Sequence, residues 1–585
     1  MSRIANPPPA ESGSQAKPPA KVPPKSQDSL RDFVEQIVIA FILAFLIRGF
    51  DAEAFVIPTG SMAPTLMGRH KEVTCPECGH LYAINASEET ETFIVERRLK
   101  EVGICGNCRY RTDVDTTPSF KGDRILVMKF PDDLPFLPGS AGPRRWDVVV
   151  FHYPEKPETN YIKRLVGMPG DELKINHGDI QTRRSGTNSS FGIERKPLIH
   201  QDAMQMLVFD DAHRPKAFDG KPEWQRWQKG DKWTEATPGT FQANATDPQA
   251  WADLRYRHLV PDPEQWAAIE QKQPLPRGPR ASLITDFYSY NTNISPAYYD
   301  LWLQMNEGYL QPNWVGDLTV AGHVEITSTT PIGRLRLELV EAGVSHRCEI
   351  DLTTGKAMLF RGDTPLDEAT TALKGTGGHD VRFANVDDRL TLWVDGGTPF
   401  GDGVAYEDPP TTTYIPTAAD LDPVGISVRG CQAKVSGLVL QRDIYYTQDP
   451  RDPDLKVAGV HEGIDHNDPN LAGRVVKLFD FLSDPTRFGE LKNLATHDPY
   501  VIRPDHFMMM GDNSPRSSDS RAWENRDSLW RVEDRLQWEV PRSLLIGKAF
   551  FIYWPHGKPF GPDLRLNRDF RLPFRPYFER MKWIR

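Results

Sequence analysis

The sequence has few cysteines and no excess of positive charge, and both shortages exclude classes of protein. Its 585 residues include only six cysteines, which is too few for a disulfide-dense secreted scaffold. The formal net charge is -10 at pH 7, so the basic balance of a nucleic-acid-binding protein is absent. The length predicts roughly three or four domains. Residues 1–28 are rich in proline and predict a disordered tail.

Long hydrophobic runs are also scarce, and a single segment suggests contact with a membrane. It reads FVEQIVIAFILAFLIRGF, and its uninterrupted apolar part, Ile37–Ile47, is short against the roughly 20 residues that span a bilayer. Arg48 closes the run and basic residues precede it, which favours a transmembrane anchor over 29–50 with its N-terminus in the cytoplasm. A cleaved signal peptide, suggested by Ala52-Glu53-Ala54, and a buried soluble helix are the alternatives.

A short stretch just after this segment, IPTGSMAPTL, places one serine among residues that restrict the backbone. Pro58 and Pro64 each limit a backbone angle, and Gly60 allows a conformation closed to other residues. Ser61 is therefore either an ordinary turn serine that bonds backbone or a rigidly held nucleophile.

Three alternating runs that follow predict strands, and one of them contains a lysine. The runs are GDRILVMKF, RRWDVVVFHYP and YIKRLVGMPGDELKI. Lys163 stands between Ile162 and Leu165 in the third run. A lysine on an edge strand usually points to water, whereas a buried lysine has a lowered pKa and can act as a base near pH 7.

The motifs in chain order carry a resemblance to a known family. SMAPTL, GDRILVMKF, RRWDVVVF, YIKRLVGMPGD and GDNSPRSSDSR resemble the five sequence boxes of type I signal peptidases, and VPRSLLIGKAFFIYWP follows as that family's closing strands do. The similarity covers roughly 29–67, 119–175 and 500–556. It implies a mainly β fold: a signal-peptidase-type catalytic core behind an N-terminal transmembrane helix, interrupted by two insertions.

The resemblance also implies a role for each matching residue. Ser61 is similar to the nucleophile and Lys163 to the general base of a Ser/Lys dyad. Ser517 corresponds to the serine that orients the lysine, and the Thr59 hydroxyl with the Ser61 backbone N–H corresponds to the oxyanion hole. The structural support matches Asp512, Asn513, Asp519 and Arg521. The shallow apolar pockets for small substrate side chains match Phe55, Ile57, Met62, Leu66 and Ile162.

The function implied is that of a membrane-anchored serine endopeptidase that removes signal peptides from exported preproteins after small residues. Catalysis would need no cofactor, and no nucleic-acid partner is expected. The implied partners are exported preproteins and the lipid bilayer, with the protein-export machinery as a further candidate. The implied location is a bacterial plasma membrane, with the catalytic domain on the extracytoplasmic side. An inactive binding platform and a self-cleaving Ser/Lys repressor-type protease are the alternatives.

The first insertion, 69–118, separates the nucleophile segment 51–68 from the second core segment, 119–175. It contains two Cys-x-x-Cys knuckles, and such pairs converge four thiolates on a tetrahedral zinc. A structural zinc ribbon is therefore expected, with two disulfides or two redox centres as alternatives. The four predicted ligands are Cys75, Cys78, Cys105 and Cys108.

The second insertion is much longer. Residues 176–313 show no clear period, whereas 314–446 alternate as the strands of an antiparallel β-sandwich do. The LTLWVDG strand and its neighbours resemble laminin-G or concanavalin-like jelly rolls, so both sugar binding and a spacer or docking role stay open. Cys348 and Cys431 lie in its strands as two buried thiols or as a disulfide. A return segment, 447–499, leads to the last core segment, 500–585.

Overall fold

The structure is a computed structural model that divides into two units, Met1–Ala52 and Glu53–Arg585. In the first unit, residues 33–40 are helical and their side chains are exposed. No helix among the described residues is long and apolar enough to cross a bilayer. The described residues are 33–40, 52–87, 102–114, 117–129, 142–292, 313–407, 414–448, 455–456, 482–490, 492–493, 498–523, 536–559 and 574–585. The predicted tail, 1–28, and residues 29–32 and 41–50 of the predicted anchor lie outside them.

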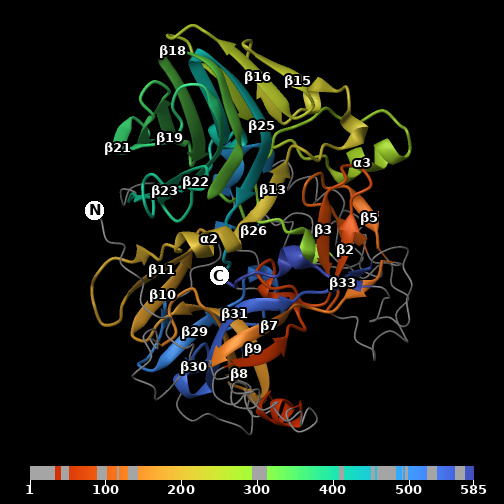
Figure 1. Ribbon diagram of the computed structural model, residues 1–585, viewed down its shortest axis with the longest axis vertical. Coiled ribbons are helices and arrows are strands. Elements are labelled where there is room, and N and C mark those ends of the chain that lie inside the picture. Colours follow the sequence, from red (N-terminus) through yellow and green to blue (C-terminus); the bar gives the residue numbers. More distant parts are fainter. Residues whose placement is uncertain are drawn as a thin grey trace, which may run out of the picture. The chain divides into compact units, whose positions relative to one another are not determined.

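The second unit is mainly β with antiparallel sheets, so the predicted fold class is confirmed at that level. A seven-stranded core sheet, in the lower half of Figure 1, has the order β1-β7-β31-β8-β9-β29-β30. The three segments that resemble the peptidase boxes supply all seven strands, although the insertions separate them along the chain. The strands are β1 (Ala52–Val56), β7 (Arg124–Lys129), β8 (Val148–Tyr153), β9 (Lys156–Gly167), β29 (His506–Met510), β30 (Val540–Pro541) and β31 (Leu545–Trp554).

A second, four-stranded sheet continues from the core. In β10, Asp171, Leu173 and Ile175 are buried while the residues between them are half-buried, the alternation expected of a strand with one covered face. The sheet has the order β12-β11-β10-β28. Its strands are β10 (Asp171–Asn176), β11 (Asp179–Arg184), β12 (Gly192–Ile193) and β28 (Tyr500–Val501).

The first insertion forms small sheets around the four cysteines. β2 pairs with β3 and β6, and β4 pairs with β5. Because strands this short bury little apolar surface of their own, the insertion packs its cysteines against Trp224 and Trp266 of the second insertion. The strands are β2 (His70–Thr74), β3 (Leu81–Asn85), β4 (Val102–Ile104), β5 (Arg111–Asp113) and β6 (Ser119–Phe120).

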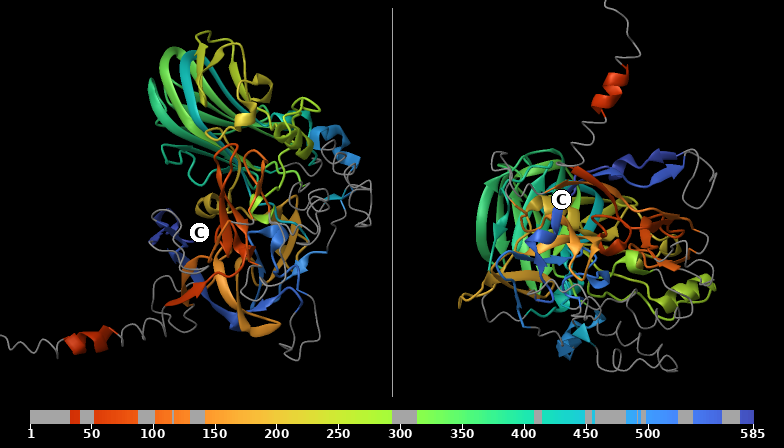
Figure 2. Two further views of the ribbon diagram at one scale, coloured as in Figure 1. Left: turned by 90° about the vertical axis from the view of Figure 1, so that its right-hand side faces the viewer. Right: turned by 90° about the horizontal axis from the view of Figure 1, so that it is seen from below.

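The second insertion is organised by two long strands, β18 (Leu318–Glu341) and β25 (Val424–Arg442), which pair along nearly their whole length. The first half of β18 also pairs with β22, and its second half with β19. Side chains from both halves enter one hydrophobic core, so the two halves act as the layers of a sandwich. Figure 2 shows the curvature of these strands.

The sheet of the sandwich extends beyond the boundary predicted at residue 314. β13, β16 and β17 pair with β25, and β14 pairs with β17, so strands from 206–256 belong to the same sheet. These strands are short and separated by turns, which explains why the sequence showed no clear period there. The remaining strands of the sheet are β13 (Met206–Asp210), β14 (Trp227–Lys229), β15 (Trp233–Thr237), β16 (Thr240–Ala245), β17 (Ala252–Tyr256), β19 (Val344–Asp351), β20 (Lys356–Arg361), β21 (Thr364–Thr370), β22 (Gly377–Asn385), β23 (Arg389–Val394) and β24 (Val404–Ala405).

Two short α-helices accompany these sheets. In α3, Asp262 accepts from the backbone N–H of Gln265 while Gln265 bonds back, which forms a capping box. The helices are α2 (Leu198–Met204) and α3 (Pro263–Glu270), with single 3-10 turns at η2 (Gly60–Met62), η3 (Lys216–Phe218), η4 (Pro222–Trp224), η5 (Ser289–Thr292), η7 (Ala418–Leu421), η8 (Pro485–Glu490), η9 (Ser514–Arg516), η10 (Arg542–Leu544) and η11 (Phe578–Arg580). Two small strand pairs complete the described elements, β26 (Leu455–Lys456) with β27 (Lys492–Asn493), and β32 (Gly557–Pro559) with β33 (Phe574–Pro576).

Candidate active site

The predicted nucleophile lies in a tight turn at the end of β1. Ser61 is the middle residue of η2 and is 8% exposed. Gly60 before it has no room for a side chain, because a Cβ there would stand 2.3 Å from the ring of Tyr290. The turn therefore requires glycine at this position and holds Ser61 against the core.

Lys163 reaches the serine from β9, which is separated from β1 by three strands of the core sheet. Its Nζ donates to Ser61 Oγ at 2.7 Å and to the Ile162 carbonyl at 3.1 Å. Burial lowers the pKa of Lys163 to about 8, although the nearby carboxylates of Asp519 and Asp512 oppose that effect. The side chain is thus a lysine that is substantially neutral near pH 8, which is what a general base for a hydroxyl requires.

The two residues whose hydroxyls are predicted to assist catalysis, Thr59 and Ser517, differ in exposure. Thr59 is exposed, in an extended conformation directly before η2. Ser517 is buried, and its hydroxyl forms no hydrogen bond with Lys163 in the described part of the chain. It lies beside Gly511, where a Cβ would stand 2.2 Å from Ser517 Oγ and 2.4 Å from the Ser61 carbonyl oxygen, so Gly511 allows the two serines to approach each other. The predicted orienting role of Ser517 stays a prediction.

Asp512 forms a buried ion pair with Arg164, a residue not singled out from the sequence. Arg164 Nε and Nη2 donate to the two carboxylate oxygens at 2.7 and 2.6 Å, and both side chains are fully buried. Thr65 Oγ1 also donates to Asp512, which ties the end of the nucleophile turn to the same carboxylate. One signal in the sequence could have identified Arg164. It is a charged residue directly after the candidate base, on a strand that becomes buried.

Asp519 and Arg521 form the ion pair that was predicted for them. Arg521 Nε and Nη2 donate to Asp519 at 2.9 and 2.7 Å, and Arg521 also donates to Thr447 and Ser514. Asp519 in turn accepts from the Gly511 backbone. Arg521 lowers the pKa of Asp519 against the effect of burial. The pair therefore fixes the loop that faces Ser61 and Lys163.

Asn513 connects this loop to the nucleophile turn and to the second insertion. Its backbone N–H donates to the Ser61 carbonyl, and its side-chain amide donates to the Gly60 carbonyl, both at 3.1 Å. The same amide exchanges two hydrogen bonds with Asn291, at 2.7 and 2.8 Å. Asn291 lies in η5, in a stretch without a recognisable motif, so sequence reasoning missed that the insertion braces the site.

The five predicted pocket residues belong to one hydrophobic cluster. Ile57, Met62 and Leu66 are buried, while Phe55 and Ile162 are half-buried beside them. Strands β7, β8 and β31 supply most of the other members. The structure thus places the five side chains together beside the dyad. A separate cavity of about 220 Å³, lined among others by Phe209, Arg214 and Trp224, lies in the insertion and contains no predicted site residue.

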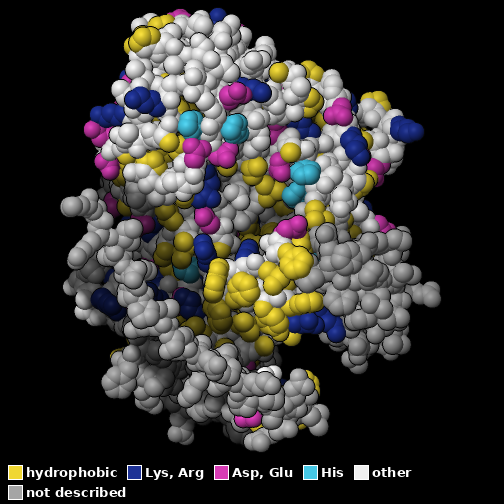
Figure 3. All heavy atoms as spheres, viewed as in Figure 1, with side chains coloured by type: hydrophobic (Ala, Val, Ile, Leu, Met, Phe, Trp, Pro, Cys, Tyr) yellow, Lys and Arg dark blue, Asp and Glu magenta, His cyan; other side chains and the backbone are white. Residues whose placement is uncertain are grey.

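Hydrophobic side chains also gather on the outside of this sheet. Figure 3 shows them on the face over β7 and β31. The exposed large side chains of this part of the chain are Val56, Met128, Phe578 and Trp583, each more than half exposed. Trp583 pairs with Phe551 of β31. An exposed apolar patch of this kind marks a surface for another protein or a membrane.

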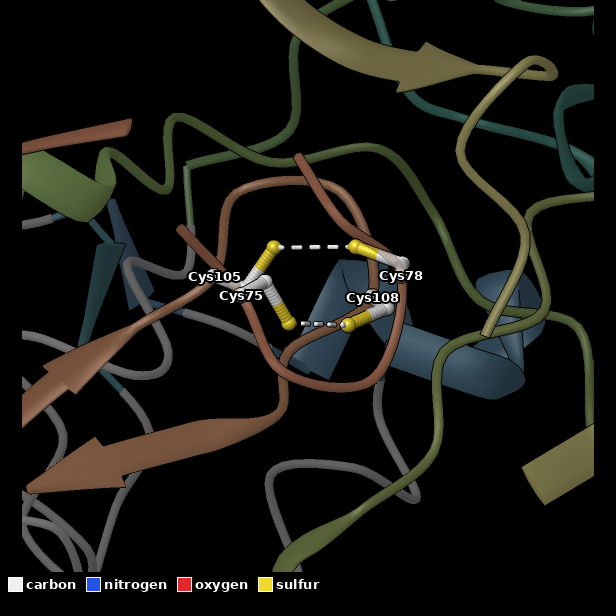
Figure 4. Close-up of side chains that lie close together, drawn as sticks. All are labelled: Cys75, Cys78, Cys105 and Cys108. Carbon is white, nitrogen blue, oxygen red and sulfur yellow. Dashed lines mark hydrogen bonds between the residues drawn. The ribbon is translucent and has the colours of Figure 1, made fainter. Parts of the chain in front are cut away.

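The four predicted metal ligands converge at the tips of the two knuckles (Figure 4). Cys75 Sγ lies 3.5 Å from Cys108 Sγ, and Cys78 Sγ lies 3.6 Å from Cys105 Sγ. All four are buried and free, and their sulfur atoms lie within 4.8 Å of one another. Sulfur ligands at about 2.3 Å from a tetrahedral zinc stand roughly 3.8 Å apart, so the donor set fits zinc. Cys348 and Cys431 are likewise buried and free.

Comparison with known proteins supports one family for the catalytic segments. The model of signal peptidase, peptidase S26, matches residues 110–213 and 466–554. These ranges include Lys163 and Ser517, whereas Ser61 precedes them. The family match supports the S26 signal peptidases, and the pairing of Ser61 with Lys163 rests on the geometry above.

Curated relatives agree with this family over short stretches. Signal peptidase I of Pseudomonas aeruginosa is 49% identical over 59 residues, 9% of this chain and 21% of that protein. That of Pseudomonas fluorescens is 28% identical over 130 residues, 22% of this chain and 29% of that protein. That of Rickettsia akari is 28% identical over 152 residues, 25% of this chain and 42% of that protein. The chain thus spans less than a third of the first two relatives' length.

Solved structures match with low TM-scores. The carbohydrate-binding module CBM66 from Bacillus subtilis is 10% identical and covers 37% of this chain and 96% of its own, with a TM-score of 0.22. Sheep galectin-11 is 11% identical and covers 21% of this chain and 90% of its own, with a TM-score of 0.16. Scores this low confirm neither the laminin-G-like assignment nor a ligand for the sandwich.

Proposed function

We propose that this protein is a membrane-anchored signal peptidase that cleaves signal peptides from exported preproteins after small residues, by a Ser61/Lys163 dyad. The observation that carries the proposal is the 2.7 Å contact between Lys163 Nζ and Ser61 Oγ, made by a buried lysine with a lowered pKa. The family match supports the reaction class, since it names signal peptidases. The exposed apolar face over β7 and β31 suits a catalytic domain that works at a membrane surface.

The proposed reaction uses the neutral lysine twice. Lys163 takes the Ser61 hydroxyl proton as Oγ bonds to the carbonyl carbon of the scissile peptide. The Thr59 hydroxyl and the Ser61 N–H stabilise the oxyanion that forms. Lys163 then returns the proton to the departing amine as the C–N bond breaks. Water, activated by the same lysine, finally hydrolyses the acyl ester and restores Ser61.

The proposed substrate preference follows from the pocket residues. Ile57, Met62 and Leu66 fill the space beside the dyad, so only small side chains before the cut would fit. The anchor remains part of the proposal as the segment 29–50. Protease protection of a tagged N-terminus in inverted vesicles would test its orientation.

The dyad is tested by processing of a purified preprotein with a signal peptide. Ser61→Ala, Lys163→Ala and Lys163→Arg should each abolish cleavage, because arginine does not deprotonate near neutrality. Two exposed neighbours serve as controls: Ser518→Ala and Lys156→Ala should cleave like the wild type. Robust cleavage by Ser61→Ala would contradict the mechanism, and a folded wild type that binds preproteins without cutting them would support the inactive platform.

The four cysteines are proposed to bind one structural zinc. The four sulfur atoms lie within 4.8 Å of one another and none is in a disulfide, as a tetrahedral ligand set requires. Cys75→Ser should remove one zinc per chain and loosen the first insertion, because zinc binding contributes folding free energy. Cys348→Ser is the matched control and should keep the metal. Elemental analysis without zinc, with the four sulfurs paired as disulfides, would overturn the proposal.

A further inference from the structure

A second group of potential metal ligands lies where the first insertion joins the catalytic core. His70 and Glu72 alternate on β2, so their side chains share one face of the strand. His556 follows β31 after Pro555 and comes to the same place. One ligand atom from each residue lies within 4.8 Å of the others. Two imidazoles and one carboxylate are a donor set typical of zinc.

The hydrogen bonding of His70 leaves one ring nitrogen available as a ligand. Its Nδ1 lies 2.7 Å from the Gly68 carbonyl oxygen, to which a protonated Nδ1 donates. Nε2 then carries a lone pair. A histidine ligand in proteins usually has this arrangement, with the second nitrogen bonded to a carbonyl or carboxylate that fixes the tautomer.

His556 is buried without a satisfactory partner. It is 5% exposed, and neither ring nitrogen has a hydrogen bond in the described part of the chain. Its Nε2 nevertheless lies 3.1 Å from Glu72 Oε1, and its ring stands edge-on to that of His70, with centroids 5.0 Å apart. Two ligands about 2.0–2.1 Å from one tetrahedral zinc stand roughly 3.3 Å apart, so this separation suits a shared ion.

A guanidinium whose positive charge acts on His70 has its own carboxylate partner. Arg580, a nearby guanidinium, is paired with Asp123 at 2.6 Å. Glu72 therefore supplies one negative charge to a site whose other two ligands are neutral imidazoles. A buried ring nitrogen without a hydrogen bond is destabilising, and metal binding removes that cost.

We propose that His70, Glu72 and His556 bind a divalent transition-metal ion, with zinc as the expected ion. The ion joins β2, which leads from the nucleophile turn into the cysteine insertion, to the end of β31. Gly68, whose carbonyl oxygen bonds His70 Nδ1, packs closely against the nucleophile turn. A Cβ at Gly68 would stand 2.2 Å from the Thr59 carbonyl carbon. The ion thus supports the back of the turn that carries Ser61, and its binding does not depend on the peptidase proposal.

The test compares the metal content of the purified full-length chain and its variants after dialysis against a weak chelator. His70→Gln, Glu72→Gln and His556→Gln should each lose one ion relative to the wild type. Loss of a residue that only hydrogen-bonds a metal ligand lowers metal affinity roughly 10–100-fold. Because these variants replace a ligand itself, we expect a larger loss of affinity for the metal ion. Cys75→Ser should leave this ion in place, and combining Cys75→Ser with His556→Gln should remove one ion more than Cys75→Ser does.

Two control variants separate this site from other histidines. His346→Gln removes another buried histidine whose nitrogens have no hydrogen bond in the described part of the chain, and it should keep the full metal content. His213→Gln disrupts a half-buried group formed with His80 and Asp210 and should also keep it. Loss of the ion in His213→Gln but not in His556→Gln would overturn the proposal.

If the variants fail to fold, a measurement on the unmodified protein still tests the site. X-ray absorption at the zinc edge should show a shell that mixes sulfur with nitrogen and oxygen. A shell of sulfur alone, or a wild type whose metal content equals that of His556→Gln, would overturn the site. Signal-peptide cleavage enters none of these readouts, so failure of the peptidase proposal remains distinguishable.

Discussion

The catalytic core and the sandwich both bury charged side chains, but in different settings. The core buries Lys163, Arg164, Asp512, Asp519 and Arg521 around one serine. The sandwich buries Glu341, Asp387 and Arg442 beside a large hydrophobic core that includes Cys348 and Cys431. Buried ion pairs contribute little net stability compared with apolar packing, but they define positions sharply. We therefore expect apolar packing to stabilise the sandwich most, and the buried charges of the catalytic core to fix the position of Ser61.

The largest expected effect comes from breaking the buried pair at the site. Arg164→Ala leaves Asp512 buried without its partner and should lower the free energy of unfolding by about 3–5 kcal/mol. Chemical denaturation measures the change. Arg183→Ala is the matched control, since its pair with Glu172 is partly exposed, and should cost at most about 1 kcal/mol. Equal losses in the two variants would remove the distinction between the pairs.

The next effect concerns the cost of burying the candidate base. The folded pKa of Lys163, about 8, lies below the 10.5 of an exposed lysine, so between these values the unfolded chain holds a proton that the folded chain lacks. Stability from this group therefore rises with pH across that window and is lowest below pH 8. Lys163→Met should raise the free energy of unfolding by about 3 kcal/mol at pH 7 and flatten its pH dependence.

Urea denaturation at several pH values measures this effect. Lys156→Met, an exposed lysine on the same strand, should keep the wild-type pH dependence. Cleavage by the wild type should rise with pH through about 8, as the amine loses its proton. Unchanged stability in Lys163→Met at neutral pH would show that burial of the lysine carries no such cost.

A smaller effect tests whether hydrogen bonds from the second insertion help to position the nucleophile in the catalytic core. Asn291→Ala removes both amide bonds to Asn513, which holds the Ser61 and Gly60 carbonyls. We expect kcat to fall about 10–100-fold with little change in KM, because the nucleophile loses its position rather than its substrate contacts. Asn244→Ala, which breaks an exposed amide bond on β16, should leave kinetics unchanged. A loss confined to KM would assign Asn291 to substrate binding instead.

The smallest effect is expected on the surface of the sandwich. Lys434 and Glu325 lie 3.6 Å apart and are each 44% exposed. Lys434→Ala should change the free energy of unfolding by less than about 0.5 kcal/mol and leave peptide cleavage unaltered. Thermal denaturation and a peptide assay check both expectations. A large loss of activity would show that this face takes part in processing.

The sequence was sufficient where signals are local. Alternation predicted the core strands, and the resemblance of the boxes to those of signal peptidases implied that Ser61 and Lys163 lie together. Arg164 was missed because its partner Asp512 is distant in sequence, and an arginine in a strand usually faces water. Asn291 was missed because a hydrogen bond between two side-chain amides produces no periodic pattern in the sequence. The membership of β13, β16 and β17 in the sandwich follows from pairing with β25, which no local pattern encodes.

The bond between Asn291 and Asn513 has a consequence for the timing of maturation. Ser61 leaves the ribosome early, whereas the residues that hold its turn are synthesised 230 or more positions later. The catalytic turn therefore cannot reach its final shape until the long insertion has folded and the last core segment has joined the sheet. Under the proposed function, a peptidase assembled in this order would become reactive only after its last segment has been synthesised and folded.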